Sequence, residues 1–339
     1  MTRLPSLALI GNGWAAETYA RATQQSGAGS VRWLVARNAA AGQTFCHRFH
    51  ISQLVLNIQD LAPPGECSLV IVCIPPRESP PVIAGLLSRG YCVLAEKPGA
   101  ESSHHLAGAL LKCSAPQVRR LAFAYQLFHD DRVVLAREVI RSGTIGRPER
   151  AHLKMHMPTE GWSTGRRGWA LGPGATSVWV EAGVHLTALA AWLFGPAHVV
   201  EVSNQRVDGH CVAGTALLKH QTGVVSTLDV SFLGTPSAPR GGVRIEGSAG
   251  RLHLSRGTYL DKRSLLRLEL PGGRTSTTSP APENGTLRLL NRALALSNSS
   301  NTLATSNMVD HIRALEYLRL AESLETRSFY GAASASSSD

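Results

Sequence analysis

Short apolar runs alternate with segments of helical composition over the first third of the chain. The runs that predict strands span 7–10, 31–36, 68–74, 91–95 and 121–125. The helical segments between them span 14–24, 38–49 and 80–89. A run that is apolar at almost every position, such as SLVIVCI at 68–74, is typical of a parallel strand buried on both faces. This alternation predicts a doubly wound parallel sheet of the Rossmann type, an α/β fold.

The pattern changes after residue 124, where the first domain is expected to end. Helices are predicted over 130–142, 177–194, 287–296 and about 303–326. Runs separated by turn residues predict mostly antiparallel strands over 150–157, 198–207, 212–220, 223–232, 242–246 and 251–254. The glycine-rich segment 159–176 is expected to form a loop over a substrate, and 272–301 to form long loops. A length of 339 residues suits two domains, predicted as 1–124 and 125–331, with a flexible tail at 332–339.

The segment LALIGNGWAA at 7–16 joins the first predicted strand to the first helix. Its spacing of Gly11, Gly13 and Ala16 fits the G-x-G-x-x-G/A turn of dinucleotide-binding folds. Gly11 permits the tight turn, Gly13 lets a pyrophosphate approach the backbone, and Ala16 lets the helix pack closely on the strand. Because free N–H groups at a helix N-terminus attract phosphate, this turn is predicted to bind a dinucleotide.

The end of the second predicted strand bears on which dinucleotide is bound. Folds that bind NAD place an Asp or Glu there, which accepts the ribose 2′-hydroxyl. This chain has Ala36 followed by Arg37, which leaves room for a 2′-phosphate and offers it a guanidinium. The sequence therefore favours NADP(H), with NAD(H) as an accepted cofactor. The competing interpretation is that Arg37 is only a solvated loop charge.

Composition narrows the class of protein. The formal net charge is +10, but no run of five basic residues marks a nucleic-acid-binding tail. The six cysteines form no C-x-x-C pair, which favours reduced core residues in a cytoplasmic protein. No apolar run reaches 18 residues, so no membrane span is expected. His152 and His156 share a strand face without further ligands nearby, so no metal site is expected either.

Motifs along the chain resemble those of the Gfo/Idh/MocA oxidoreductases, nicotinamide-dependent enzymes that act mainly on sugars and cyclitols. They are GNGWAA from Gly11, IPP from Ile74, LAEKPGA from Leu94, SGTIGRP from Ser142, EAGVH from Glu181, AAWLFG from Ala190 and IEGSAGRLHL from Ile245. The resemblance implies a C-terminal α/β domain with a large, open, mostly antiparallel sheet and a last helix that packs back toward the first domain. It also implies a homo-oligomer, a dimer or tetramer, assembled through the outer face of that sheet.

The resemblance implies three catalytic residues. Lys97, in the E-K-P motif that follows a strand, would stabilise the substrate oxygen near the nicotinamide and share in proton transfer. Glu181 and His185 match the family's D-x-x-x-H motif, and residues four apart share one face of a helix. His185 would exchange the proton, and Glu181 would orient and stabilise its imidazole. The chain departs from the family pattern at Glu181 itself, at Ala188 in place of an Asp, and at Ser79 in place of a His.

Further residues are expected to line the site. The cofactor is expected to contact Gly11, Asn12, Gly13, Trp14, Ala15, Arg37, Ile74, Pro75, Pro76, Glu96, Lys97 and Pro98. The substrate, a small molecule, is expected to contact Lys97, Tyr125, Trp162, Arg166, Trp169, Glu181 and His185. The resemblance also allows a cis peptide bond between Lys97 and Pro98.

The predicted function is the interconversion of a hydroxyl and a ketone on a sugar, cyclitol or related polar ring. Three alternatives stay open. A glycosidase of the same family would oxidise and re-reduce its substrate around bond cleavage, and a regulator would bind the dinucleotide without turnover. A serine hydrolase would use Ser163 in the G-x-S-x-G match at 161–165, although that match is followed by Arg166 and Arg167 rather than by a helix.

Overall fold

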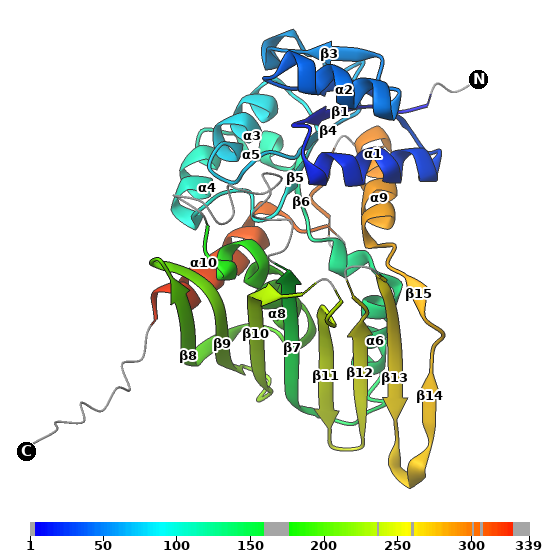
Figure 1. The fold of residues 1–339 in the computed structure, drawn as a ribbon, viewed down its shortest axis with the longest axis vertical. Coiled ribbons are helices and arrows are strands. Elements are labelled where there is room, and N and C mark those ends of the chain that lie inside the picture. The colour runs from blue at the N-terminus through cyan, green and yellow to red at the C-terminus, as the bar shows by residue number, and fades with distance from the viewer. Residues whose placement is uncertain are drawn as a thin grey trace, which may run out of the picture.

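Two sheets, one above the other, form the body of the computed structural model (Figure 1). The structure describes residues 4–158, 176–235, 237–258, 261–299, 302–305 and 308–327. Most of the predicted substrate loop, with Trp162, Ser163, Arg166 and Trp169, therefore lies outside the described residues, as does the predicted tail 332–339. Among the described helices, none combines the length and the apolarity needed to cross a bilayer.

The upper sheet is the predicted Rossmann sheet. Its six parallel strands lie in the order β3-β2-β1-β4-β5-β6. They are β1 (Ser6–Ile10), β2 (Ser30–Val35), β3 (Gln53–Val55), β4 (Leu69–Val72), β5 (Val93–Glu96) and β6 (Leu121–Ala124). Helical segments between them are α1 (Trp14–Ser26), α2 (Ala39–Phe49), η1 (Ile58–Asp60), α3 (Ser79–Ser88), α4 (Ser103–Leu110) and α5 (Ala115–Val118). The five predicted strands are confirmed, whereas β3, α4 and α5 had no predicted counterpart.

Both faces of the upper sheet are covered, as its apolar strands predict. Leu7 and Leu9 pack in one core cluster, and Ala8 and Ile10 pack in the other. All four side chains are at most 5% exposed. Successive residues of a strand point to opposite faces, so β1 contributes to a core on each side of the sheet.

The lower sheet is mostly antiparallel and runs in the order β14-β13-β12-β11-β7-β10-β9-β8, with β15 on β13. Its strands are β7 (Pro148–Pro158), β8 (Ala197–Val207), β9 (His210–His220), β10 (Val225–Gly234), β11 (Gly241–Gly247), β12 (Gly250–Arg256), β13 (Arg263–Glu269), β14 (Thr275–Thr277) and β15 (Ala281–Pro282). Only the contact of β7 with β10 is parallel among the described pairs. The six predicted strands are confirmed. The helix predicted over 287–296 is confirmed within α9, at 285–299. The rest of 272–301, predicted as long loops, also holds the short strands β14 and β15.

The helices after β6 are η2 (Gln126–His129), α6 (Asp131–Arg141), η4 (Trp179–Gly183), α8 (Val184–Phe194), η5 (Pro271–Gly273), α9 (Gly285–Ser299) and α10 (His311–Thr326). The helix predicted over 177–194 is divided, because η4 is π-helical before α8 begins. The start predicted for the last helix, near residue 303, is wrong. Val309 bridges to Phe123 beside β6, and Asp310 then caps α10 by accepting a hydrogen bond from the Arg313 N–H.

Two helices from the C-terminal part of the chain contact the upper sheet and its helices. Leu289, Leu290 and Leu294 of α9 are buried in the same core cluster as Leu7 and Tyr19. Helix α9 lies within the range 125–331 assigned to the second domain, so long-range packing places part of that range on the first domain. Helix α10 contacts α4, where the Glu322 carboxylate accepts hydrogen bonds from the Ser103 N–H and hydroxyl at 2.9 and 2.6 Å.

Candidate active site

The glycine turn after β1 has the geometry that a dinucleotide needs. Gly11 has a φ of +99°, and a Cβ there would lie 2.6 Å from the Cys73 carbonyl oxygen. A Cβ on Gly13 would meet nothing within 4 Å in the described part of the chain, so the space beside it is open. Gly13 is also the N-cap of α1 and supplies no side-chain hydrogen bond to that helix. The N–H groups of the first turn are therefore available to a pyrophosphate, which fits the site.

The carboxyl ends of neighbouring strands bring the other predicted cofactor residues to this turn. Strand β1 pairs with β4, and β4 pairs with β5. Because parallel strands end at one edge, the segments after β4 and β5 lie beside Gly11. These segments hold Ile74, Pro75, Pro76, Lys97 and Pro98, and Glu96 is the last residue of β5. The peptide bond between Lys97 and Pro98 is cis.

Lys97 joins the two parts of the molecule through Glu181 of η4. Its Nζ donates to the Glu181 carbonyl oxygen at 2.8 Å and to Glu181 Oε1 at 3.1 Å. The two side chains are only 12% and 8% exposed. These bonds use two of the three ammonium protons, so one remains for a substrate oxygen.

The expectation that Glu181 orients His185 does not agree with this arrangement, since the Glu181 carboxylate pairs with Lys97. The cause is local, because η4 is a π-helical turn over Trp179–Gly183. A π turn holds more residues than an α turn, so side chains four apart no longer lie one above the other. The Glu181 carboxylate thus contacts Lys97, and no contact between it and the imidazole is found among the described residues.

His185 lies in the first turn of α8, beside the ring of Tyr125. The two rings meet edge to face with centres 6.1 Å apart. The buried His185 Nδ1 and Tyr125 hydroxyl have no hydrogen-bond partner among the described residues. Burial holds the pKa of His185 well below its ordinary value of 6.5, and the charges of Lys97 and Arg256 lower it further. The imidazole is therefore neutral at physiological pH and can accept a proton.

A hydrogen-bonded group behind Lys97 was not predicted as a unit. Tyr19 Oη and Gln126 Nε2 each donate to Glu96 Oε1 at 2.8 Å. Burial raises the pKa of Glu96, and the neighbouring charge of Lys97 opposes that shift. Tyr19 and Gln126 come from α1 and η2, and no motif in the sequence singles them out. Their bonds to Glu96 fix the residue that precedes Lys97.

A second unpredicted group lies near His185. Glu283 Oε1 accepts hydrogen bonds from Arg240 at 2.7 Å and from Arg256 at 3.0 Å. Although burial opposes ionisation, these two guanidiniums lower the pKa of Glu283 to about 2. The predicted strand ended at residue 254, two positions before Arg256, so the sequence pattern did not identify Arg256. The charge of Arg256 in this group lowers the pKa of His185.

Arg37 follows β2 as predicted, but its guanidinium forms an ion pair with the carboxylate of Glu78. Its guanidinium contacts Glu78 at 3.2 Å (Nη2 to Oε1) and at 3.1 Å (Nη1 to Oε2). The side chains are 85% and 38% exposed, and surface pairs of this kind contribute only about 0–1 kcal/mol.

Trp14, at the first position of α1, is 52% exposed, and Lys262 Nζ lies 5.6 Å from its ring centre.

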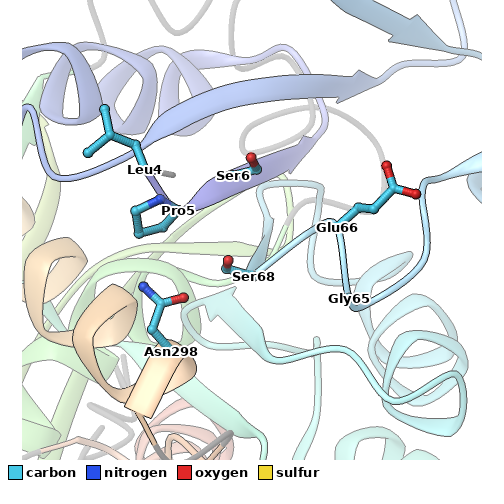
Figure 2. A pocket seen from close by; sticks show the side chains of 7 residues that line it. All are labelled: Leu4, Pro5, Ser6, Gly65, Glu66, Ser68 and Asn298. Atoms are coloured by element: carbon cyan, nitrogen blue, oxygen red, sulfur yellow. The ribbon is translucent and has the colours of Figure 1, made fainter. Parts of the chain in front are cut away.

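A hollow of about 450 Å³ lies at the opposite edge of the parallel sheet (Figure 2). Its lining residues precede or open the strands β1 and β4, or lie near the end of α9: Leu4, Pro5, Ser6, Gly65, Glu66, Ser68 and Asn298. Ligands of doubly wound sheets bind at the carboxyl ends of the strands, so this hollow is not the cofactor site.

The described residues hold no group of three His, Cys, Asp or Glu side chains placed to bind a metal ion.

A glycine turn at the carboxyl edge of a Rossmann sheet, with a lysine at the end of another strand of that sheet, is typical of dinucleotide-dependent oxidoreductases. Residues 6–122 match the family model of the oxidoreductase family with an NAD-binding Rossmann fold, GFO_IDH_MocA. Residues 133–253 match the model of the GFO/IDH/MocA C-terminal domain. The chain belongs to the Gfo/Idh/MocA family of NAD(P)-dependent oxidoreductases.

Named proteins similar to this chain include D-apiose dehydrogenase of Rhizobium rhizogenes, 30% identical over 150 residues. That match covers 42% of this chain and 40% of the relative, so it spans less than half of the relative's length. An oxidoreductase from Agrobacterium radiobacter, solved with NAD+, L-tartaric acid and magnesium, has a TM-score of 0.78 at 19% identity and 95% coverage of both chains. A 3-ketoreductase from Actinomadura kijaniata, solved with NADP and TDP-benzene, has a TM-score of 0.79 at 18% identity, with 96% of this chain and 98% of that chain covered. The two structures share the fold of this chain.

Proposed function

We propose that this protein interconverts a hydroxyl and a ketone on a sugar, cyclitol or related polar ring, with NADP(H) preferred and NAD(H) accepted. The observation that carries the proposal is the Lys97 ammonium, held by Glu181 at the carboxyl edge of the Rossmann sheet. The names of the similar D-apiose dehydrogenase and 3-ketoreductase support a sugar-like substrate. When bound at the glycine turn, the dinucleotide would supply or accept the hydride.

The residues of the chain would handle the proton and the charge on the substrate oxygen. The remaining ammonium proton of Lys97 would bind that oxygen and stabilise the negative charge that develops on it. Neutral His185 would take the hydroxyl proton during oxidation and return it during reduction. Its Nδ1 is the buried ring nitrogen, so Nε2 would face the substrate. Glu181 would hold the ammonium in place.

A substrate screen tests this function directly. The purified protein would be incubated with NADP+ or NAD+ and a panel of free pentoses, hexoses, cyclitols and sugar acids, and with NADPH or NADH and their keto forms. We expect a change in nicotinamide absorbance that matches the amount of keto or hydroxyl product formed. Cleavage of a glycosidic bond without net oxidation or reduction of the nicotinamide would contradict the proposed dehydrogenase activity and indicate a glycosidase. Tight binding of the dinucleotide without turnover of any substrate in the panel would contradict the proposal that the protein is an enzyme.

The preference for NADP(H) is tested by Arg37→Ala. A charge-assisted bond to phosphate contributes about 1.5–3 kcal/mol, which corresponds to an affinity about 10- to 100-fold weaker for NADPH. NADH lacks the 2′-phosphate, so its Kd is expected to change less than about threefold. Titration of tryptophan fluorescence measures both constants. Arg119→Ala, which removes the same charge just before β6 at the other edge of the sheet, is the control. Equal losses for both cofactors would contradict the assigned contact.

A further inference from the structure

A carboxylate reaches the end of β2 from a different part of the sheet. Arg37 lies after β2, whereas Glu78 lies between β4 and α3. Strands β2 and β4 are the two hydrogen-bonded neighbours of β1. The ion pair between Arg37 and Glu78 therefore crosses the carboxyl end of β1, at the edge where Gly11 begins the dinucleotide-binding turn. Glu78 thus brings a negative charge to the end of β2, although β2 itself does not end in an acidic residue.

The backbone holds Glu78 in this position. Its N–H donates to the Pro75 carbonyl oxygen at 3.0 Å, closing a turn through Pro76 and Arg77. Glu78 is the N-cap residue of α3, yet its side chain makes no capping hydrogen bond. Instead, both carboxylate oxygens contact the guanidinium of Arg37. The turn after β4 thus directs the carboxylate across the crevice toward the residue that follows β2.

We propose that Glu78 reads the 2′ position of the cofactor's ribose, an inference that rests on the proposed function. In NAD-binding folds an acid at the end of the second strand accepts the 2′-hydroxyl, and Glu78 supplies that acid from the loop after β4. A 2′-phosphate must instead separate Arg37 from Glu78 and lie close to a like charge. Glu78 therefore supports NAD(H) and limits the preference for NADP(H) that Arg37 confers.

The weakness of the ion pair is what allows both cofactors to bind. The Arg37 side chain is 85% exposed, so water competes for it and the pair opens readily. A phosphate carries more negative charge than a carboxylate and takes over the guanidinium when it is present. Without a phosphate, Glu78 keeps its contact with Arg37, and the paired groups remain beside the ribose hydroxyls.

The test is Glu78→Gln in the full-length protein, with the Kd of NADH and of NADPH measured by tryptophan fluorescence. Loss of repulsion between a carboxylate and a phosphate a few ångströms apart in salt solution corresponds to about a three- to tenfold effect. We expect the ratio of the NADH Kd to the NADPH Kd to rise by about that factor. Glu78→Lys is expected to raise the ratio further. Both variants change surface side chains, and thermal unfolding would show that they fold.

Glu66→Gln is the matched control, because it removes the same charge from an exposed side chain at the opposite edge of the sheet (Figure 2). Its ratio is expected to equal that of the wild type. An unchanged ratio in Glu78→Gln and Glu78→Lys, or an equal change in Glu66→Gln, would overturn the role of Glu78. Failure of the proposed function looks different, since the wild type would then bind neither dinucleotide or would bind both without turnover.

Discussion

Lys97→Met is expected to lower kcat/KM for the sugar-like substrate by about 10²–10⁴-fold, with little change in the Kd of the dinucleotide. In the proposed function the ammonium would supply the hydrogen bond and the positive charge that the substrate oxygen needs as hydride moves, and the methionine side chain offers neither. Steady-state kinetics with the best substrate of the screen measure the loss. Fluorescence titration measures the retained affinity for the cofactor.

Folding must be separated from catalysis in this variant. Glu181 is 8% exposed, and without Lys97 its charge would be buried and unpaired. Lys97→Met combined with Glu181→Gln removes that charge, and we expect this double variant to recover thermal stability but not activity. Lys112→Met, at an exposed position after α4, is the control for loss of a lysine. Activity within tenfold of the wild type in a folded Lys97→Met protein would contradict the role of Lys97.

His185→Asn is expected to lower kcat for alcohol oxidation by about 10²–10³-fold, because the variant would lack the base proposed for the hydroxyl proton. The wild-type pH profile gives a second readout. The pKa of His185 is lowered well below 6.5, first by burial and then by the charges of Lys97 and Arg256. The base therefore stays unprotonated down to that lower pKa, and kcat/KM should fall only at pH values well below 6.5.

The lowered pKa of His185 also predicts how stability changes with pH and how the pH profile of Lys97→Met differs from that of the wild type. Unfolded His185 binds a proton more readily than folded His185, so the folded state loses stability as the pH falls below 6.5. Lys97→Met removes one of the charges that lower this pKa, so the acid limb of its residual activity should move toward higher pH. An acid limb that stays in place in Lys97→Met and persists in His185→Asn would show that another group titrates.

Much of the fold follows from local sequence rules. The apolar runs of the first domain identified five of the six parallel strands, because a strand buried on both faces needs an apolar residue at nearly every position. Strand β3 was missed because it has only three residues, Gln53–Val55. The glycine turn was also readable, since Gly11 adopts a φ of +99° that favours glycine.

The sequence by itself therefore determined the Rossmann sheet, the dinucleotide turn and the position of Lys97 at the end of a strand. Each depends on residues close together in the chain. The tertiary structure decided the partners: Glu181 contacts Lys97, 84 positions away, and Glu78 contacts Arg37, 41 positions away. A π-helical turn rotates Glu181 away from the helix spacing that its sequence suggests, and the strand order brings Glu78 across β1. Contacts of this kind depend on packing between distant segments, which local spacing does not encode.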